Sequence, residues 1–140
     1  MVRKSERIRA EVQKFHGGRW DPHYAGYFDQ FNRQLFYEAH DVLEQLWLAD
    51  RHGPDGAFYK GLIQLAGAFV HLQKNRPGPS AALFKLARAN LERYPSRHRG
   101  LDLSALLQMI ESWIASIEAT SPPGNPLPLR PPPKLALSAE

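Results

Sequence analysis

Apolar residues recur every three or four positions along most of the chain, which is the spacing of an amphipathic α-helix. The regularity is clearest over residues 103–117, and Asp102 is a suitable N-cap for a helix there. No stretch of useful length alternates between apolar and polar residues, as a half-buried strand would. The pattern therefore predicts an all-α protein, a single bundle of four to five helices.

Earlier segments carry the same helical spacing, and Gly, Pro or Asp residues separate them. These segments are residues 3–15, 22–31, 32–50, 57–74 and 80–94. Residues 57–74 are apolar around most of the helix, so this segment is predicted to lie at the centre of the bundle. In the segment 80–94, Leu86 is expected to face the core. One strip interrupts the apolar surface of the central helix, and it consists of Lys60, Gln64, Gly67, His71 and Lys74.

The composition divides the chain into three parts: a basic N-terminal helix in residues 1–18, a helical bundle in residues 19–120 and a Pro-rich tail in residues 121–140. The tail has no helical period and cannot bury a core of its own. We therefore expect it to be polyproline-like or disordered, although its PxxP spacing also occurs in binding motifs. On this interpretation, deleting residues 122–140 leaves the thermal stability nearly unchanged.

The residue types that are missing exclude several classes of function. The chain has no cysteine, which rules out disulfides, thiolate metal sites and cysteine nucleophiles. It also has no GxSxG, GxGxxG or P-loop motif, which argues against those hydrolase and nucleotide-binding classes. No apolar run reaches the roughly 18–20 residues of a membrane span, and the basic start lacks the apolar stretch of a secretory signal. We expect a cytoplasmic protein with no membrane association.

Charged residues are segregated along the chain. Residues 1–20 hold six basic and two acidic residues, residues 21–55 hold seven acidic and two basic ones, and residues 74–99 hold seven basic residues and one acid. Such a separation either steers a partner or pairs one helix with another. Pairing inside the fold, or within a homo-oligomer, is the simpler interpretation and the one we favour.

The helix of residues 32–50 carries a cluster of ionisable residues. His40 and Glu44 are four positions apart and therefore share one face, whereas Glu38 lies on the opposite edge of the apolar stripe. Asp41 is expected further out, toward solvent. If this helix packs antiparallel to the helix of residues 57–74, His40 and Glu44 can meet His71 in one pocket.

Three interpretations of this pocket are open. A structural hydrogen-bond network that fixes the register of the helices is the one we favour. The second is a divalent metal site with His40, Glu44 and His71 as ligands, in which Glu38 is a candidate catalytic base. The third is an acid–base pair formed by a half-buried carboxylate beside an imidazole.

A basic turn near residue 95 raises a separate hypothesis. Arg93, Arg97 and Arg99 surround an aromatic residue and, together with the basic N-terminal helix, can contact the phosphates of a nucleic acid. No recognised nucleic-acid-binding module accompanies them, so a solvated loop is the favoured interpretation and nucleic-acid binding is unexpected.

Residues 31–47 read FNRQLFYEAHDVLEQLW, which resembles the FNxGxFFEAHExLExxW signature of the domain of unknown function 309 family. Residues 62–66, His71 and residues 91–95 resemble its second and third blocks, so the resemblance covers about residues 21–95. It implies a small helical prokaryotic protein with no established activity. The positions that it highlights are Asn32, Glu38, His40, Glu44, Trp47, Gln64 and His71. The family tends to have Gly where this chain has Gln34, so a left-handed turn there would be strained or reshaped.

The leading hypothesis is a non-enzymatic helical module that binds an unknown protein or small molecule, or associates with itself. The absence of a strong catalytic motif and the apolar central helix favour it. A metal-dependent, hydrolase-like enzyme is the alternative and is the only one that requires a cofactor, a divalent metal. Nucleic-acid binding ranks third.

Overall fold

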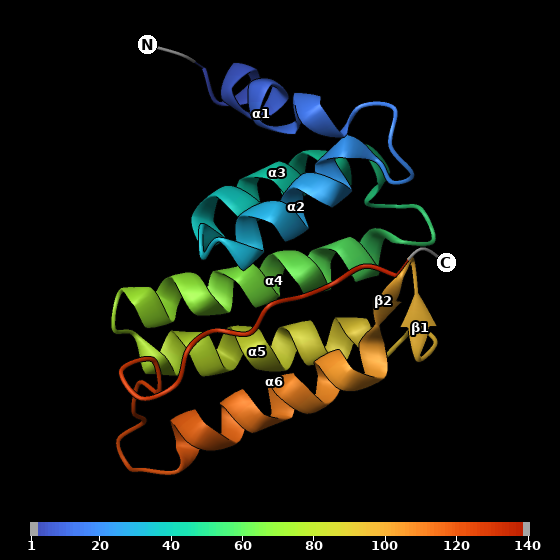
Figure 1. Ribbon diagram of the computed structural model, residues 1–140. Coiled ribbons are helices and arrows are strands. Elements are labelled where there is room, and N and C mark those ends of the chain that lie inside the picture. The colour runs from blue at the N-terminus through green and yellow to red at the C-terminus, as the bar shows by residue number, and fades with distance from the viewer. Residues whose placement is uncertain (1–2, 139–140) are drawn as a thin grey trace.

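The computed structural model describes residues 3–138, and within them it is almost entirely helical. The helices are α1 (Lys4–Val12), α2 (Pro22–Asn32), α3 (Phe36–Asp50), α4 (Gly56–Gln73), α5 (Pro77–Leu91) and α6 (Leu103–Glu118), with a 3₁₀ turn, η1 (Gln13–Phe15), after α1. The strands of the described residues, β1 (Arg97–His98) and β2 (Leu101–Asp102), form a minimal antiparallel hairpin. The all-α prediction is confirmed. Figure 1 shows the helices stacked on one another in chain order.

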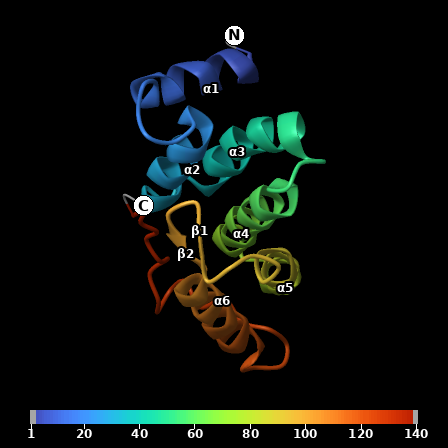
Figure 2. The same cartoon turned by 90° about the vertical axis from the view of Figure 1, so that its right-hand side faces the viewer.

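Helix α4 lies at the centre of this stack, between α3 and α5 (Figures 1 and 2). Phe58, Leu62 and Phe69 on α4 are completely buried. At Gly61 a Cβ atom would lie 2.8 Å from Leu91 Cγ, so the close approach of α5 requires a glycine there. The central position predicted for residues 57–74 is confirmed.

The predicted caps of α2 and α6 are confirmed, but some helix boundaries and one orientation are not. The Asp21 side chain accepts a hydrogen bond from His23 N, and the Asp102 side chain accepts one from Ala105 N. Helix α5 begins at Pro77 rather than residue 80, because a proline suits the first turn of a helix. The prediction that Leu86 faces the core is wrong, since 51% of this residue is exposed.

Helices α2 and α3 are joined by a tight turn at Gln34. Its φ is +62°, in the left-handed region, and Leu35 N donates to Gln30 O across the turn. The chain thus adopts a left-handed turn at the position where the family that it resembles tends to have Gly. A side chain in this conformation costs about 1–2 kcal/mol.

Replacing Gln34 by Gly is expected to raise the free energy of unfolding by about 1 kcal/mol, because Gly removes the left-handed strain. The matched control is Arg33→Gly, one residue earlier at φ −89°, where no such strain exists and the change should destabilise. Urea unfolding of both variants measures the difference. A Gln34→Gly protein less stable than the wild type would contradict this account of the turn.

The first helix is fixed to the bundle by both apolar and ionic contacts. Ile8 and Val12 of α1 pack with Val42 of α3, and all three are buried. Above this contact, Arg7 Nη2 lies 3.1 Å from Asp41 Oδ2. The basic start of the chain therefore pairs with the acidic helix, as the segregation of charge predicts.

The Pro-rich tail is not disordered, and here the sequence-based prediction is wrong. Residues 121–138, which we call the C-terminal strap, contain a turn at 127–129 and no regular secondary structure; from residue 131 the chain runs along the bundle and returns to the β-hairpin (Figure 1). Leu127, Leu135 and Leu137 pack against the core, and the side chain of Arg130 lies over Trp113 at 4.1 Å. The strap lacks a core of its own, but the bundle supplies one, so its deletion should destabilise the protein.

Candidate functional site

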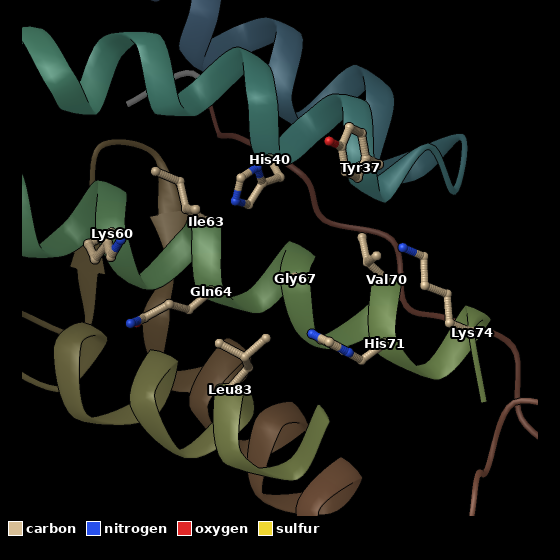
Figure 3. A pocket seen from close by; sticks show the side chains of 10 residues that line it. All are labelled: Tyr37, His40, Lys60, Ile63, Gln64, Gly67, Val70, His71, Lys74 and Leu83. Carbon is tan, nitrogen blue, oxygen red and sulfur yellow. The ribbon is translucent and has the colours of Figure 1, made fainter. Parts of the chain in front are cut away.

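A groove of about 340 Å³ opens along one side of α4, between α3 and α5. Figure 3 shows His40 and Tyr37 reaching into it from α3 and Leu83 from α5. Its lining residues are Tyr37, His40, Lys60, Ile63, Gln64, Gly67, Val70, His71, Lys74 and Leu83. All members of the strip predicted on the central helix are among them, so the strip faces this groove.

The groove combines an apolar floor with nitrogen-bearing side chains. Ile63, Val70 and Leu83 supply the apolar surface, and the bare backbone at Gly67 leaves the centre hollow (Figure 3). The polar lining consists of two lysines, two imidazoles, an amide and a phenol, and none of the lining residues of the described chain is Asp or Glu. Such a surface suits a ligand with negative charge.

His71 carries an unsatisfied polar atom at this surface. Its Nδ1 is buried and has no hydrogen-bond partner among the described residues. Burial lowers the pKa of His71 below its usual value, and the neighbouring charges of Arg76 and Lys74 lower it further. The imidazole is therefore neutral at pH 7 and has a free position for a hydrogen bond with a ligand.

His40 faces the groove while one of its nitrogens is held by the neighbouring carboxylate. Its Nδ1 lies 3.2 Å from Asp41 Oδ1, and Lys4 and Arg7 contact the same carboxylate. Asp41 is only 3% exposed, so the expectation that it points toward solvent is wrong: α1 covers it. The sequence signal that indicates this contact is the spacing of Lys4 and Arg7, which lie three positions apart on one face of the N-terminal helix.

The remaining polar residues of the groove have partners on the neighbouring helices. The ammonium group of Lys60 lies 4.4 Å from the ring centroid of Trp47, a cation–π contact. Gln64 Oε1 accepts a hydrogen bond from Asn90 Nδ2 at 2.8 Å. Trp47 and Asn90 thus orient Lys60 and Gln64 at the edge of the groove.

The ligand set expected for a metal is not assembled. His40 and His71 line the same groove, but Glu44 turns away toward Lys4, with Oε1 3.4 Å from Nζ. Glu38 is half-buried and does not line the groove. Within residues 3–138, no group of three or more His, Asp or Glu residues is placed to hold a metal ion.

Asn32 does not line this groove and instead lies beside the C-terminal strap. Its Nδ2 donates to Leu135 O and its Oδ1 accepts from Leu135 N, both at 2.7 Å. The resemblance grouped Asn32 with the polar cluster, but its partner is the backbone of the C-terminal strap. No feature of the sequence linked these two positions.

The arginines proposed for nucleic-acid binding are in different environments. Arg97 lies 4.0 Å from Asp102, and Arg93 lines a shallow hollow beside Trp47. Arg99 binds Asp55, so its charge is compensated.

Asp55 forms a second polar cluster that sequence reasoning missed. It directly precedes α4, its Oδ1 lies 2.7 Å from His98 Nε2, and its Oδ2 accepts a hydrogen bond from Arg99. Burial alone would raise the pKa of Asp55, but the hydrogen bonds and charges of Arg99 and His98 outweigh it and lower that pKa. Tyr24 donates to Arg99 O at 2.9 Å, so the cluster ties α2, α4 and the hairpin together.

Comparisons with known proteins agree with this picture of a helical protein of unassigned activity. Residues 24–83, which contain α3 and α4, match the family described as "Domain of unknown function (DUF309)". The match confirms the resemblance that the motif of residues 31–47 suggested.

Two curated relatives are similar to this chain. An uncharacterised protein of Aquifex aeolicus is 28% identical over 93 residues, which cover 66% of this chain and 28% of the relative. The uncharacterised protein YpuF of Bacillus subtilis is 28% identical over 104 residues, which cover 70% of this chain and 58% of the relative. The chain thus spans only part of both relatives. No solved structure matches it significantly.

None of the helices between residues 3 and 138 is long and apolar enough to cross a membrane.

Proposed function

We propose that this protein is a non-enzymatic binding module and that the groove between α3, α4 and α5 holds a small anion with an apolar body. The observation that carries the proposal is the lining of the groove: lysine and histidine nitrogens around an apolar floor, with no carboxylate among the lining residues. Carboxylates and phosphate esters of small apolar molecules match this surface.

The end of the groove near His71 is the better position for the anionic group. Lys74 lines this end, and the positive charges of Lys74 and Arg76 already act on His71, where they lower its pKa. The potential there is therefore positive. The imidazole of His71 is neutral, so Nδ1 can accept a hydrogen bond from a phosphate hydroxyl or, in the tautomer that carries its proton on Nδ1, donate one to a carboxylate. In both cases Lys74 neutralises the charge of the ligand.

The glycine at position 67 supports the proposal that the hollow centre of the groove holds a ligand. A glycine inside a helix costs about 1 kcal/mol relative to alanine. At Gly61 the packing of α5 explains this cost, but a Cβ at Gly67 would meet only the flexible end of Leu83, with Cδ1 at 3.2 Å. A larger side chain at residue 67 would project into the groove and fill it.

The test is a thermal-shift screen with octanoate, benzoate, adenosine monophosphate and inorganic phosphate. A ligand at ten times its Kd adds about 1.4 kcal/mol to the free energy of unfolding, which raises Tm by several degrees. We expect an amphipathic anion to do this, and expect Gly67→Leu to abolish the shift by occupying the groove. Lys74→Met should weaken it. Lys85→Met should leave it unchanged, because Lys85 lies on α5 outside the groove and pairs with Glu118 of α6.

The same screen separates this proposal from the metal-dependent alternative. His40 and His71 share the groove, so zinc and manganese chlorides are included. Stabilisation by a metal alone, lost in His40→Ala and in His71→Ala, would replace the anion proposal with the metal one. Anion shifts that persist in Gly67→Leu would place the ligand elsewhere and contradict the proposal. The proposal takes the protein to be cytoplasmic, the expectation drawn from its composition.

A further inference from the structure

The C-terminal strap ends in a channel whose shape is that of a binding site for an extended peptide. Residues 133–138 lie between α2 and α6, near the β-hairpin (Figures 1 and 2). One edge of this channel includes Trp20, Phe28 and Asn32, and the other includes Leu106 and Met109. The occupant in the structure is the chain's own tail.

The main-chain contacts in the channel do not depend on the sequence of the occupant. Asn32 both donates to and accepts from the backbone of Leu135, and Gly100 O accepts a hydrogen bond from Ser138 N at 2.8 Å. The Asn32 amide thus pairs with the backbone of Leu135 much as a neighbouring strand would, and Gly100 adds one true backbone bond. A side chain at Gly100 would collide with Trp20 and with Ser138 O, so the glycine keeps the channel open.

The side-chain contacts depend on alternate positions. Leu135 and Leu137 are half-buried against the core, while Lys134 and Ala136 between and beside them are exposed. This two-residue alternation is that of an extended strand whose one face packs against the bundle and whose other face is exposed. The prolines at 131–133 keep the preceding segment extended and so reduce the entropy lost on docking.

The strap is held in a way that permits release. Between Arg130 and Leu135 the structure gives no hydrogen bond from the strap to the bundle among the described residues, and Leu129 is 96% exposed. Extended segments with few backbone bonds open at a small fraction of the global free energy of unfolding. The tail therefore resembles a tethered ligand, which a free peptide must displace in order to bind in the channel.

We propose that this channel is a docking site for an extended segment of another protein with the chemistry of the tail: prolines followed by two leucines in alternate positions. The tail fills the site until such a segment displaces it. Asn32 recognises the backbone of the segment. The leucines are received by apolar surface that Trp20 and Phe28 provide on one side and α6 and the hairpin on the other. The inference does not rest on the anion groove, since the two sites have no residue in common.

The test uses the full chain with the tail released by Leu135→Asp and Leu137→Asp, and a fluorescent peptide of sequence RPPPKLALS as the probe. Fluorescence anisotropy is expected to show binding to the released protein at least about ten-fold tighter than to the wild type, where the tethered tail competes. Adding Asn32→Ala should weaken binding about ten-fold through the loss of two hydrogen bonds. The matched control Asn90→Ala removes an amide on α5 and should have no effect.

Three results would overturn the proposal. Failure of the peptide to bind a released protein that circular dichroism shows to be folded would leave the strap a purely structural segment. If a peptide with both leucines changed to serine bound as tightly as the original peptide, the binding would not depend on the leucine contacts in the channel. A wild-type dimer that disappears in the released variant would make the tail of a second copy the occupant instead of another protein.

Hydrogen exchange of the wild type keeps the test decisive if the released variant does not fold. The amides of Leu135 and Ser138 are expected to exchange at least about 100-fold faster than those of Leu65 and Phe69 in α4, because the strap opens locally. Equal protection of both sets would mean that the strap leaves only on global unfolding, which would overturn the proposal.

Discussion

The Phe69→Ala variant is expected to lose about 3–5 kcal/mol of its free energy of unfolding. Phe69 is completely buried in the C-terminal half of α4, and its ring contacts an aromatic residue on each of the helices α2, α3, α5 and α6. These partners are Phe31 on α2, Phe36 on α3, Phe84 on α5 and Trp113 on α6, with ring centroids 5.7, 5.0, 5.2 and 5.0 Å away. Removing the ring opens one cavity that all five helices line, so no single helix can shift to close it.

Urea unfolding followed by far-UV circular dichroism and by tryptophan fluorescence measures this loss. Trp113 touches the deleted ring, so its emission should move to longer wavelength in the folded variant. The matched control is Leu86→Ala, a deletion on the exposed side of α5 that should change stability by less than about 0.5 kcal/mol. Similar losses in both variants would show that Phe69 is not the packing centre of the bundle.

The arrangement of the helices, and much of the groove, follow from the spacing of apolar residues. Residues 57–74 are apolar on nearly every side, and only a helix with neighbours all around buries such a surface. The one strip left over must then face a gap between those neighbours. For this reason the sequence predicted the central place of α4 and the strip from Lys60 to Lys74 that α4 contributes to the groove. It also predicted that His40 can share a pocket with His71, although not without Glu44.

Other features depend on contacts between segments far apart in the sequence. The strap carries no helical period, and its order comes from Asn32, which is 103 residues away from Leu135. The burial of Asp41 requires α1 to cross α3, which periodicity along a single helix does not reveal. Glu44 shares a helix face with His40, but its partner Lys4 on α1 turns it away from the groove. The ligand set of the alternative metal hypothesis, His40, Glu44 and His71, is therefore not brought together in one place.

The Asp55→Ala variant is expected to be about 2–3 kcal/mol less stable than the wild type at pH 7. Asp55 is nearly buried, and its loss leaves His98 and Arg99 without their shared acceptor while α2, α4 and the hairpin lose their common contact. The figure is below the usual cost of breaking a buried ion pair because part of the Arg99 side chain is exposed and water screens its charge.

The pH dependence of the stabilities of the wild type and Asp55→Ala tests whether the loss of stability is electrostatic. The folded pKa of Asp55 is lower than its ordinary value of 3.8, so the folded state favours the ionised carboxyl. Its contribution is then complete above about pH 5 and is lost as the pH falls through the folded pKa. The stability difference between wild type and Asp55→Ala should therefore shrink below about pH 4, as measured by urea unfolding at several pH values.

Asp55→Asn keeps one acceptor oxygen without the charge, so its free energy of unfolding at pH 7 should lie between those of the other two proteins. A difference that stays constant down to pH 2 would show that Asp55 acts by packing alone, and the cluster would then carry no pH dependence.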